Sequence, residues 1–290
     1  MTLILGLSKP EGIYLSADFR VTQGGTVVDD ASVKLLDILF PPPEGGTRGL
    51  LAYTGLAELP GGLPMGTWLV ETMRGESEYP DQAMAHLRDR LNRDVAPQRV
   101  GLIVNVLLIE GEQGERRLLG GFTNLRSNAV TRRIDVLPTF EYVMREINGP
   151  LVFANGSGAA RVIADGHLNA ARAQLDVHPR RAHDHMKLLA TINRRVAAKE
   201  TTVSPACHVA FVPAKRPAAG TSDNRFGPMS QSFTERGESA PAVMPTLLFG
   251  IDTTLMMRDL QDRMAALKAG TEPPPDVDTD TMNRMLWRRD

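Results

Sequence analysis

Three residues near the amino end have chemistries that fit one site. Thr2 follows Met1, and removal of Met1 would leave Thr2 with a free α-amine beside its own hydroxyl. An α-amine titrates at about pH 7.7 to 8.0, so one residue would hold both a nucleophile and a base. Lys34 stands between two apolar residues, where burial is costly for its charge unless a counter-ion is near. Asp18 is the candidate counter-ion, and the charge of Lys34 would favour the neutral, basic form of the amine.

Plainer interpretations exist for each of these residues. A Met-Thr start is common and is compatible with a mobile polar terminus at Thr2. Asp18 and Lys34 are also compatible with a structural ion pair between two strands, or with two unrelated surface charges.

The offsets between the three residues carry a family resemblance. Asp18 lies 16 residues after Thr2 and Lys34 lies 32 residues after it. Asp18 stands in the sequence Leu15-Ser16-Ala17-Asp18-Phe19-Arg20. In these respects, residues 2–212 resemble the β-type subunits of the proteasome and their bacterial relatives, which are N-terminal nucleophile hydrolases. The resemblance implies an α+β fold, the four-layer αββα sandwich of that class, and threonine peptidase chemistry.

The resemblance also implies roles for a glycine and a serine. Gly55 lies in Tyr53-Thr54-Gly55-Leu56-Ala57, where the family uses a glycine N–H to stabilise the oxyanion. An ordinary strand-to-helix turn is the alternative for Gly55. Ser157 lies in Asn155-Gly156-Ser157-Gly158, where the family's serine bonds near the threonine amine and relays its proton. A helix N-cap or a phosphate-binding turn are the alternatives for Ser157.

The chain departs from the family pattern before its strand at 207–212. Family members carry an acid three residues before a serine in this region. Ser204 can take the place of the serine, but Thr201 stands three residues before it and Glu200 is one position further away. We therefore expect the second acidic support to be missing or replaced.

Apolar periodicity predicts the elements that must position these residues. Strands are expected at 3–7, 13–17, 33–39, 50–53, 102–109, 117–122, 151–154, 207–212 and 246–251. Helices are expected around 84–95, 162–166, 186–196 and 255–267. Blocks of strands and helices that alternate in this way favour a layered sandwich. We predict a hydrolase domain at 2–212, a flexible loop rich in Pro, Gly and Ser at 213–245, and an extension of strand, helix and acidic tail at 246–290.

Composition argues against several classes of function. The chain of 290 residues has 33 basic and 34 acidic side chains, so its overall charge offers no footprint for nucleic acid or an anionic membrane. The single cysteine, Cys207, excludes an internal disulfide and fits a reducing compartment. No apolar run approaches the roughly 20 residues of a membrane helix, and no secretory signal is evident. We expect a cytoplasmic protein.

We expect neither a metal nor an organic cofactor. His183-Asp184-His185 is the most tempting ligand group, but residues at i and i+2 on a helix point apart and no third ligand is apparent. A solvated helix face is the better interpretation of these residues.

These inferences predict one function and leave two alternatives. The prediction is a peptidase that attacks peptides or unfolded proteins with Thr2, in homo-oligomeric rings that the resemblance implies, with an unfoldase as a candidate partner. One alternative is a non-catalytic structural subunit of the same fold. The other is an N-terminal nucleophile amidase that acts on small amides.

Overall fold

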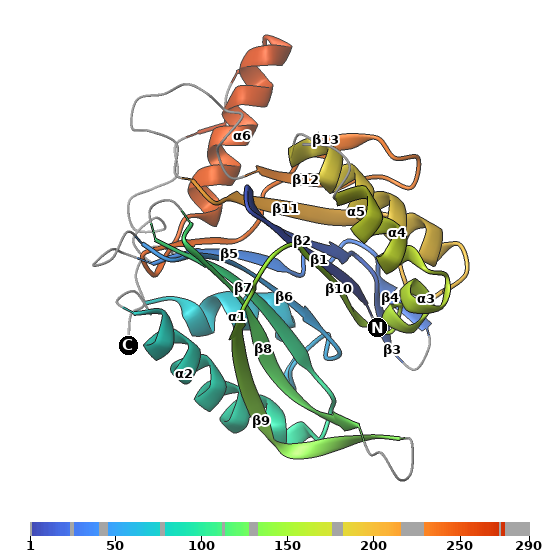
Figure 1. Ribbon diagram of the computed structural model, residues 1–290. Helices are drawn as coiled ribbons and strands as arrows, with labels where there is room; N and C mark the ends of the chain where they lie inside the picture. The colour runs from blue at the N-terminus through green and yellow to red at the C-terminus, as the bar shows by residue number, and fades with distance from the viewer. Residues whose placement is uncertain are drawn as a thin grey trace.

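The computed structural model describes residues 2–23, 26–40, 46–75, 79–111, 114–127, 133–175, 182–215, 229–272 and 274–275. Over these residues the chain has a mixed α/β fold with two large sheets and six α-helices (Figure 1). No helix in these ranges is long and apolar enough to cross a membrane.

A six-stranded antiparallel sheet contains the amino end of the chain. Its order is β10 (Leu151–Gly156), β1 (Leu3–Lys9), β2 (Gly12–Asp18), β11 (Cys207–Pro213), β12 (Met229–Phe233) and β13 (Ser239–Pro241). Strands β1 and β2 are buried along their whole length, because apolar side chains occupy both of their faces. Thr2 therefore lies at the start of a central strand, and Asp18 ends the strand beside it.

A seven-stranded sheet packs against the first. Its order is β15 (Ile251–Asp252), β14 (Thr246–Leu248), β5 (Leu35–Leu39), β6 (Arg48–Thr54), β7 (Ile103–Glu110), β8 (Arg116–Ser127) and β9 (Ile134–Glu146). Strand β14 pairs with β5 in parallel and the other pairs are antiparallel. The short strands β3 (Val21–Gln23) and β4 (Thr26–Asp29) form a separate hairpin between β2 and β5.

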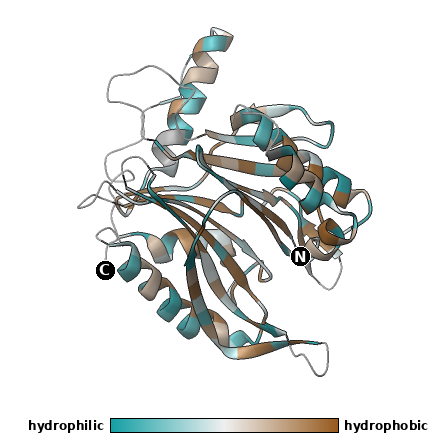
Figure 2. Cartoon of the chain, in the orientation of Figure 1, coloured by the Kyte–Doolittle hydropathy of each residue, from teal (hydrophilic) through white to brown (hydrophobic). Residues whose placement is uncertain are grey.

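Three hydrophobic clusters define how the sheets and helices pack. One lies between the sheets and includes Ile4 and Leu15 from the first and Leu50 and Leu107 from the second. A second joins the six-stranded sheet to α5 (Ala182–Ala197), with α3 (Ala159–Ala164) and α4 (His167–Leu175) beside it. A third joins the seven-stranded sheet to α1 (Met65–Met73) and α2 (Pro80–Arg90). Helices thus cover the outer face of each sheet (Figure 1), and Figure 2 shows hydrophobic residues gathered on the strands that they enclose.

The last helix stands apart from these clusters. Helix α6 (Thr254–Ala269) projects away from the two sheets in Figure 1. It ends at Gly270, whose positive φ of 67° forms a left-handed C-cap. The helix expected at 255–267 is therefore present.

Several segments differ from the sequence predictions. Strands β12 and β13 lie within 213–245, so the prediction of a flexible loop there was wrong for these residues. Strand β9 was missed although Ile134, Val136, Phe140, Tyr142 and Met144 alternate along it, and most of its residues are exposed. Residues 216–228 and the acidic tail from 276 onward lie outside the described residues.

Candidate active site

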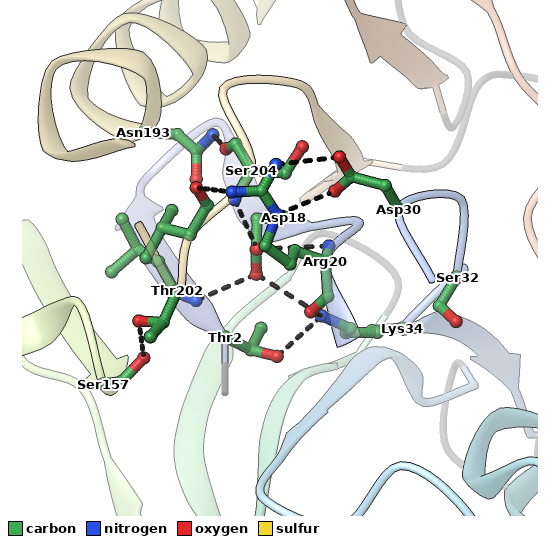
Figure 3. Close-up of polar contacts among 12 residues, drawn as sticks. Thr2, Asp18, Arg20, Asp30, Ser32, Lys34, Ser157, Asn193, Thr202 and Ser204 are labelled. Carbon is green, nitrogen blue, oxygen red and sulfur yellow. Dashed lines mark hydrogen bonds and ion pairs between the residues drawn. The ribbon is translucent and has the colours of Figure 1, made fainter. Parts of the chain in front are cut away.

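The Asp18 carboxylate holds three separate parts of the chain together. Its Oδ1 accepts the Leu3 N–H at 2.9 Å, and its Oδ2 accepts the Ser204 N–H at 2.9 Å and the Arg20 N–H at 3.2 Å (Figure 3). The side chain has no exposed surface. A carboxylate is the side chain that can accept all of these bonds together. Asp18 thereby fixes the start of β1, the end of β2 and the segment before β11.

Lys34 joins this carboxylate to Thr2. Its Nζ lies 2.6 Å from Thr2 Oγ1 and 3.5 Å from Asp18 Oδ1, and it also donates to the Arg20 carbonyl oxygen. An ammonium group carries three N–H bonds, and three acceptors surround this one. Lys34 lies just before β5 and is 3% exposed, so the sequence prediction of a buried lysine paired with Asp18 is confirmed.

Burial and charge act against each other in this pair. Burial lowers the pKa of Lys34, and the nearby Asp18 carboxylate opposes that shift. Burial likewise raises the pKa of Asp18, and Lys34 together with the backbone N–H donors opposes it. The full set of donors and acceptors around the two groups favours the charged pair, because each charge has partners that replace water.

Arg20 fastens the segment before β11 to the same place. Its guanidinium binds both carboxylate oxygens of Asp30, at 2.8 and 3.1 Å, and donates to the carbonyl oxygen of Thr201 at 2.8 Å. The Arg20 hydrogen bonds lower the pKa of Asp30 despite partial burial. From the sequence, Arg20 was recognised only as part of a motif, and Asp30 was missed. The two residues flank the β3–β4 hairpin, and a charged pair ten residues apart gives no periodic signal.

Gly156, the last residue of β10, lies against the backbone of Thr2. It pairs with Leu3 across β10 and β1, has φ of 90°, and a Cβ there would lie 1.9 Å from the Thr2 carbonyl oxygen. The same Cβ would lie 3.1 Å from Thr54 Oγ1 at the end of β6. Only glycine fits a backbone approach this close at that φ.

Gly55 follows Thr54 directly and is exposed at this meeting point of strands. Its φ is 120°, and a Cβ there would lie 2.1 Å from the Gly101 carbonyl oxygen. The turn therefore requires glycine for reasons of backbone geometry. Its role as oxyanion donor stays a prediction.

Ser157 takes part in a chain of hydroxyl contacts. It follows Gly156, which pairs with Leu3, the residue after Thr2. Its Oγ lies 3.2 Å from Thr202 Oγ1, and the Thr202 hydroxyl donates to Glu200 Oε1 at 2.7 Å (Figure 3 labels Ser157 and Thr202). The hydroxyl of Thr202 was missed by the sequence analysis, which weighed only Glu200 and Thr201 as replacements for the second acid.

The prediction of a solvent-exposed helix face at 183–185 is wrong for His185. Its side chain is fully buried, and its Nε2 lies 3.3 Å from both Lys9 Nζ and Glu11 Oε1. These contacts fix α5 to the hairpin of β1 and β2, at the end remote from Thr2. Across the described part of the chain, no group of three or more His, Cys, Asp or Glu side chains is arranged to hold a metal ion.

Comparisons with known proteins give limited information on this chain. No protein-family model matches the sequence, and no curated protein matches it. Among solved structures, the chain is similar to Anbu (ancestral beta-subunit) from Yersinia bercovieri, at 12% identity and a TM-score of 0.49, covering 95% of this chain and 99% of that chain. A likeness at this level supports no inference about activity, so any function must be inferred from the geometry of the site.

Proposed function

We propose that this chain is an N-terminal nucleophile hydrolase of the proteasome β-subunit type, which cleaves peptide bonds with Thr2. The observation that supports the proposal is the contact of 2.6 Å between Lys34 Nζ and Thr2 Oγ1, with Asp18 as the buried counter-ion. A cation that donates to a hydroxyl oxygen stabilises the negative charge that this oxygen gains on losing its proton. A structural ion pair alone would not require a hydroxyl at this position.

The proposed reaction uses the chain's own groups. Loss of Met1 frees the α-amine of Thr2, which takes the proton from Oγ1 as that oxygen attacks the substrate carbonyl. Lys34 donates to Oγ1, and the N–H of Gly55, an exposed residue, stabilises the oxyanion of the tetrahedral intermediate. The amine then passes its proton to the leaving nitrogen, with Ser157 beside it. Water finally hydrolyses the ester on Thr2: the amine takes a proton from the attacking water and returns it to Oγ1 as the acid product leaves.

The fold and assembly that we propose follow the same class. The two packed sheets, each with helices on its outer face, are interpreted as the αββα sandwich of N-terminal nucleophile hydrolases. Assembly into closed rings of identical subunits, as the family resemblance implies, would confine the nucleophiles to a chamber that admits unfolded chains. Mass photometry of the purified chain tests this part by the number of subunits.

The deciding experiment is an intact mass measured before and after treatment with a peptide epoxyketone. This probe forms a ring with both the hydroxyl and the free amine of an N-terminal threonine. We expect wild type to have lost Met1 and to gain one adduct. Thr2→Ser keeps both reacting groups and should retain labelling, whereas Thr2→Val, nearly equal in volume to threonine, should take none.

Two outcomes would contradict the proposal. Retention of Met1 without an adduct would favour a non-catalytic structural subunit. Labelling of Thr2→Val would show that another residue reacts with the probe. If the adduct forms but no peptide library is cleaved, small amides become the substrates to test.

A further inference from the structure

The acid that the family pattern requires near Ser157 is absent at its expected position, which Thr201 occupies. Thr201 is exposed, and its carbonyl oxygen accepts a bond from Arg20. Ser204 contributes its N–H to Asp18. Neither residue presents an acidic group to Ser157.

A carboxylate reaches Ser157 through another residue. Glu200 Oε1 accepts the Thr202 hydroxyl at 2.7 Å and the Thr202 N–H at 3.2 Å. This pair of bonds closes a tight turn that holds the Thr202 hydroxyl in one orientation. All three side chains in the series are partly buried, which shields their bonds from competing water.

The direction of the hydrogen bonds follows from the acceptor at the end of the series. A carboxylate only accepts, so the Thr202 hydroxyl must donate its single proton to Glu200. Thr202 Oγ1 can then only accept from Ser157, at 3.2 Å. Ser157 has thereby used its own proton, and its remaining lone pairs are left for a donor on the side of Thr2.

We propose that Thr202 couples Glu200 to Ser157, and that this coupling orients the Ser157 oxygen to accept a hydrogen bond from the Thr2 amine. The proposal rests on the proposed function, because it needs a free amine on Thr2. Thr202 and Glu200 are positioning residues that act through Ser157. They take the place of the acid that is absent at Thr201.

The coupling predicts a definite shift in the titration of the amine. An oxygen held as an acceptor beside the amine stabilises its protonated form, so the coupling raises the pKa of the amine. Lys34 acts in the opposite direction through its positive charge. The two influences together would hold the amine close to neutral pH, where a base is most effective.

The test uses the full chain from Thr2 onward, released from a cleavable N-terminal fusion so that the amine is free whether or not Met1 is removed in cells. The pKa of the Thr2 amine is read by NMR with labelled threonine, and the pH profile of epoxyketone labelling is recorded in parallel. Thr202→Val should lower the amine pKa by about 0.5 to 1 unit and move the acidic limb of the labelling profile down equally. Glu200→Gln should give a shift of the same sign.

Two matched variants control for structural damage. Thr202→Ser keeps the hydroxyl and should titrate like wild type. Thr201→Val makes the same chemical change one residue away, on an exposed side chain, and should also titrate like wild type.

The outcomes separate this inference from the proposed function. A wild-type titration in Thr202→Val, or an equal shift in Thr201→Val, overturns the coupling while leaving the nucleophile intact. Absence of labelling in wild type with a free amine overturns the proposed function, and the NMR titration still decides the coupling.

Discussion

Replacing Asp18 with asparagine tests the interpretation of the site without relying on catalysis. In wild type, Oδ1 accepts from Leu3 and Lys34, and Oδ2 accepts from Arg20 and Ser204. Asparagine has one oxygen and one NH₂ group, and the NH₂ group only donates. Whichever way the amide turns, it faces two donors that have lost their acceptor.

The expected loss of stability follows from that count. A buried donor left without a partner costs about 1 to 3 kcal/mol, and more when it is charged. Two such donors give a loss of about 4 kcal/mol, a large share of the roughly 5 to 15 kcal/mol that stabilises a typical domain. Asp30→Asn is the matched control, because this carboxylate binds Arg20 with 47% of its side chain exposed. Its loss should stay within about 1 kcal/mol.

Urea unfolding at pH 7, followed by circular dichroism, measures both variants against wild type. A loss in Asp18→Asn no larger than that of Asp30→Asn would refute the reasoning. It would mean that Asp18 is already neutral in the folded protein, so that Lys34 lacks its counter-ion and the charged form of the pair is not the native one.

Two other substitutions test separate parts of the structure. Burial lowers the pKa of His208 to about 4, so the unfolded chain takes up a proton first as the pH falls. The stability that the buried neutral histidine allows is present above about pH 6.5 and should decline by up to about 3 kcal/mol toward pH 4. His208→Gln should flatten this decline in unfolding curves measured at several pH values. Gly156→Ala should abolish epoxyketone labelling, because its Cβ would collide with the Thr2 carbonyl oxygen. Gly149→Ala, at a similar φ of 93° and with open space around it, should cost backbone strain of about 1 to 2 kcal/mol yet leave labelling intact.

The sequence predicted the central residues of the site, because their offsets from Thr2 and the apolar neighbours of Lys34 both indicated a buried ion pair. Lys34 and Asp18 do form a buried pair next to the Thr2 hydroxyl, as the apolar neighbours of Lys34 indicated. Strands β1 and β2, which follow Thr2 and end at Asp18, were also predictable, because their hydrophobic residues run nearly without a break.

Other parts of the site could not be predicted because their partners lie far apart in the chain. Nothing in the spacing of Ser157 and Thr202, 45 residues apart, shows that their hydroxyls meet. His185 was misjudged for a similar reason: its charged partners lie on a hairpin more than 170 residues earlier. A polar residue on a helix face signals exposure unless the fold supplies it with partners.

The position of Asp18 also has a consequence for the newly made protein. Its most distant donors lie 15 positions before it and 186 positions after it, so the carboxylate cannot gain its full set of bonds until about 70% of the chain has been synthesised. Until Ser204 has left the ribosome, Lys34 faces a counter-ion whose position is not yet fixed. A nascent chain would therefore carry its threonine in an unactivated form, and the order of synthesis itself would delay reactivity until the body of the protein is complete.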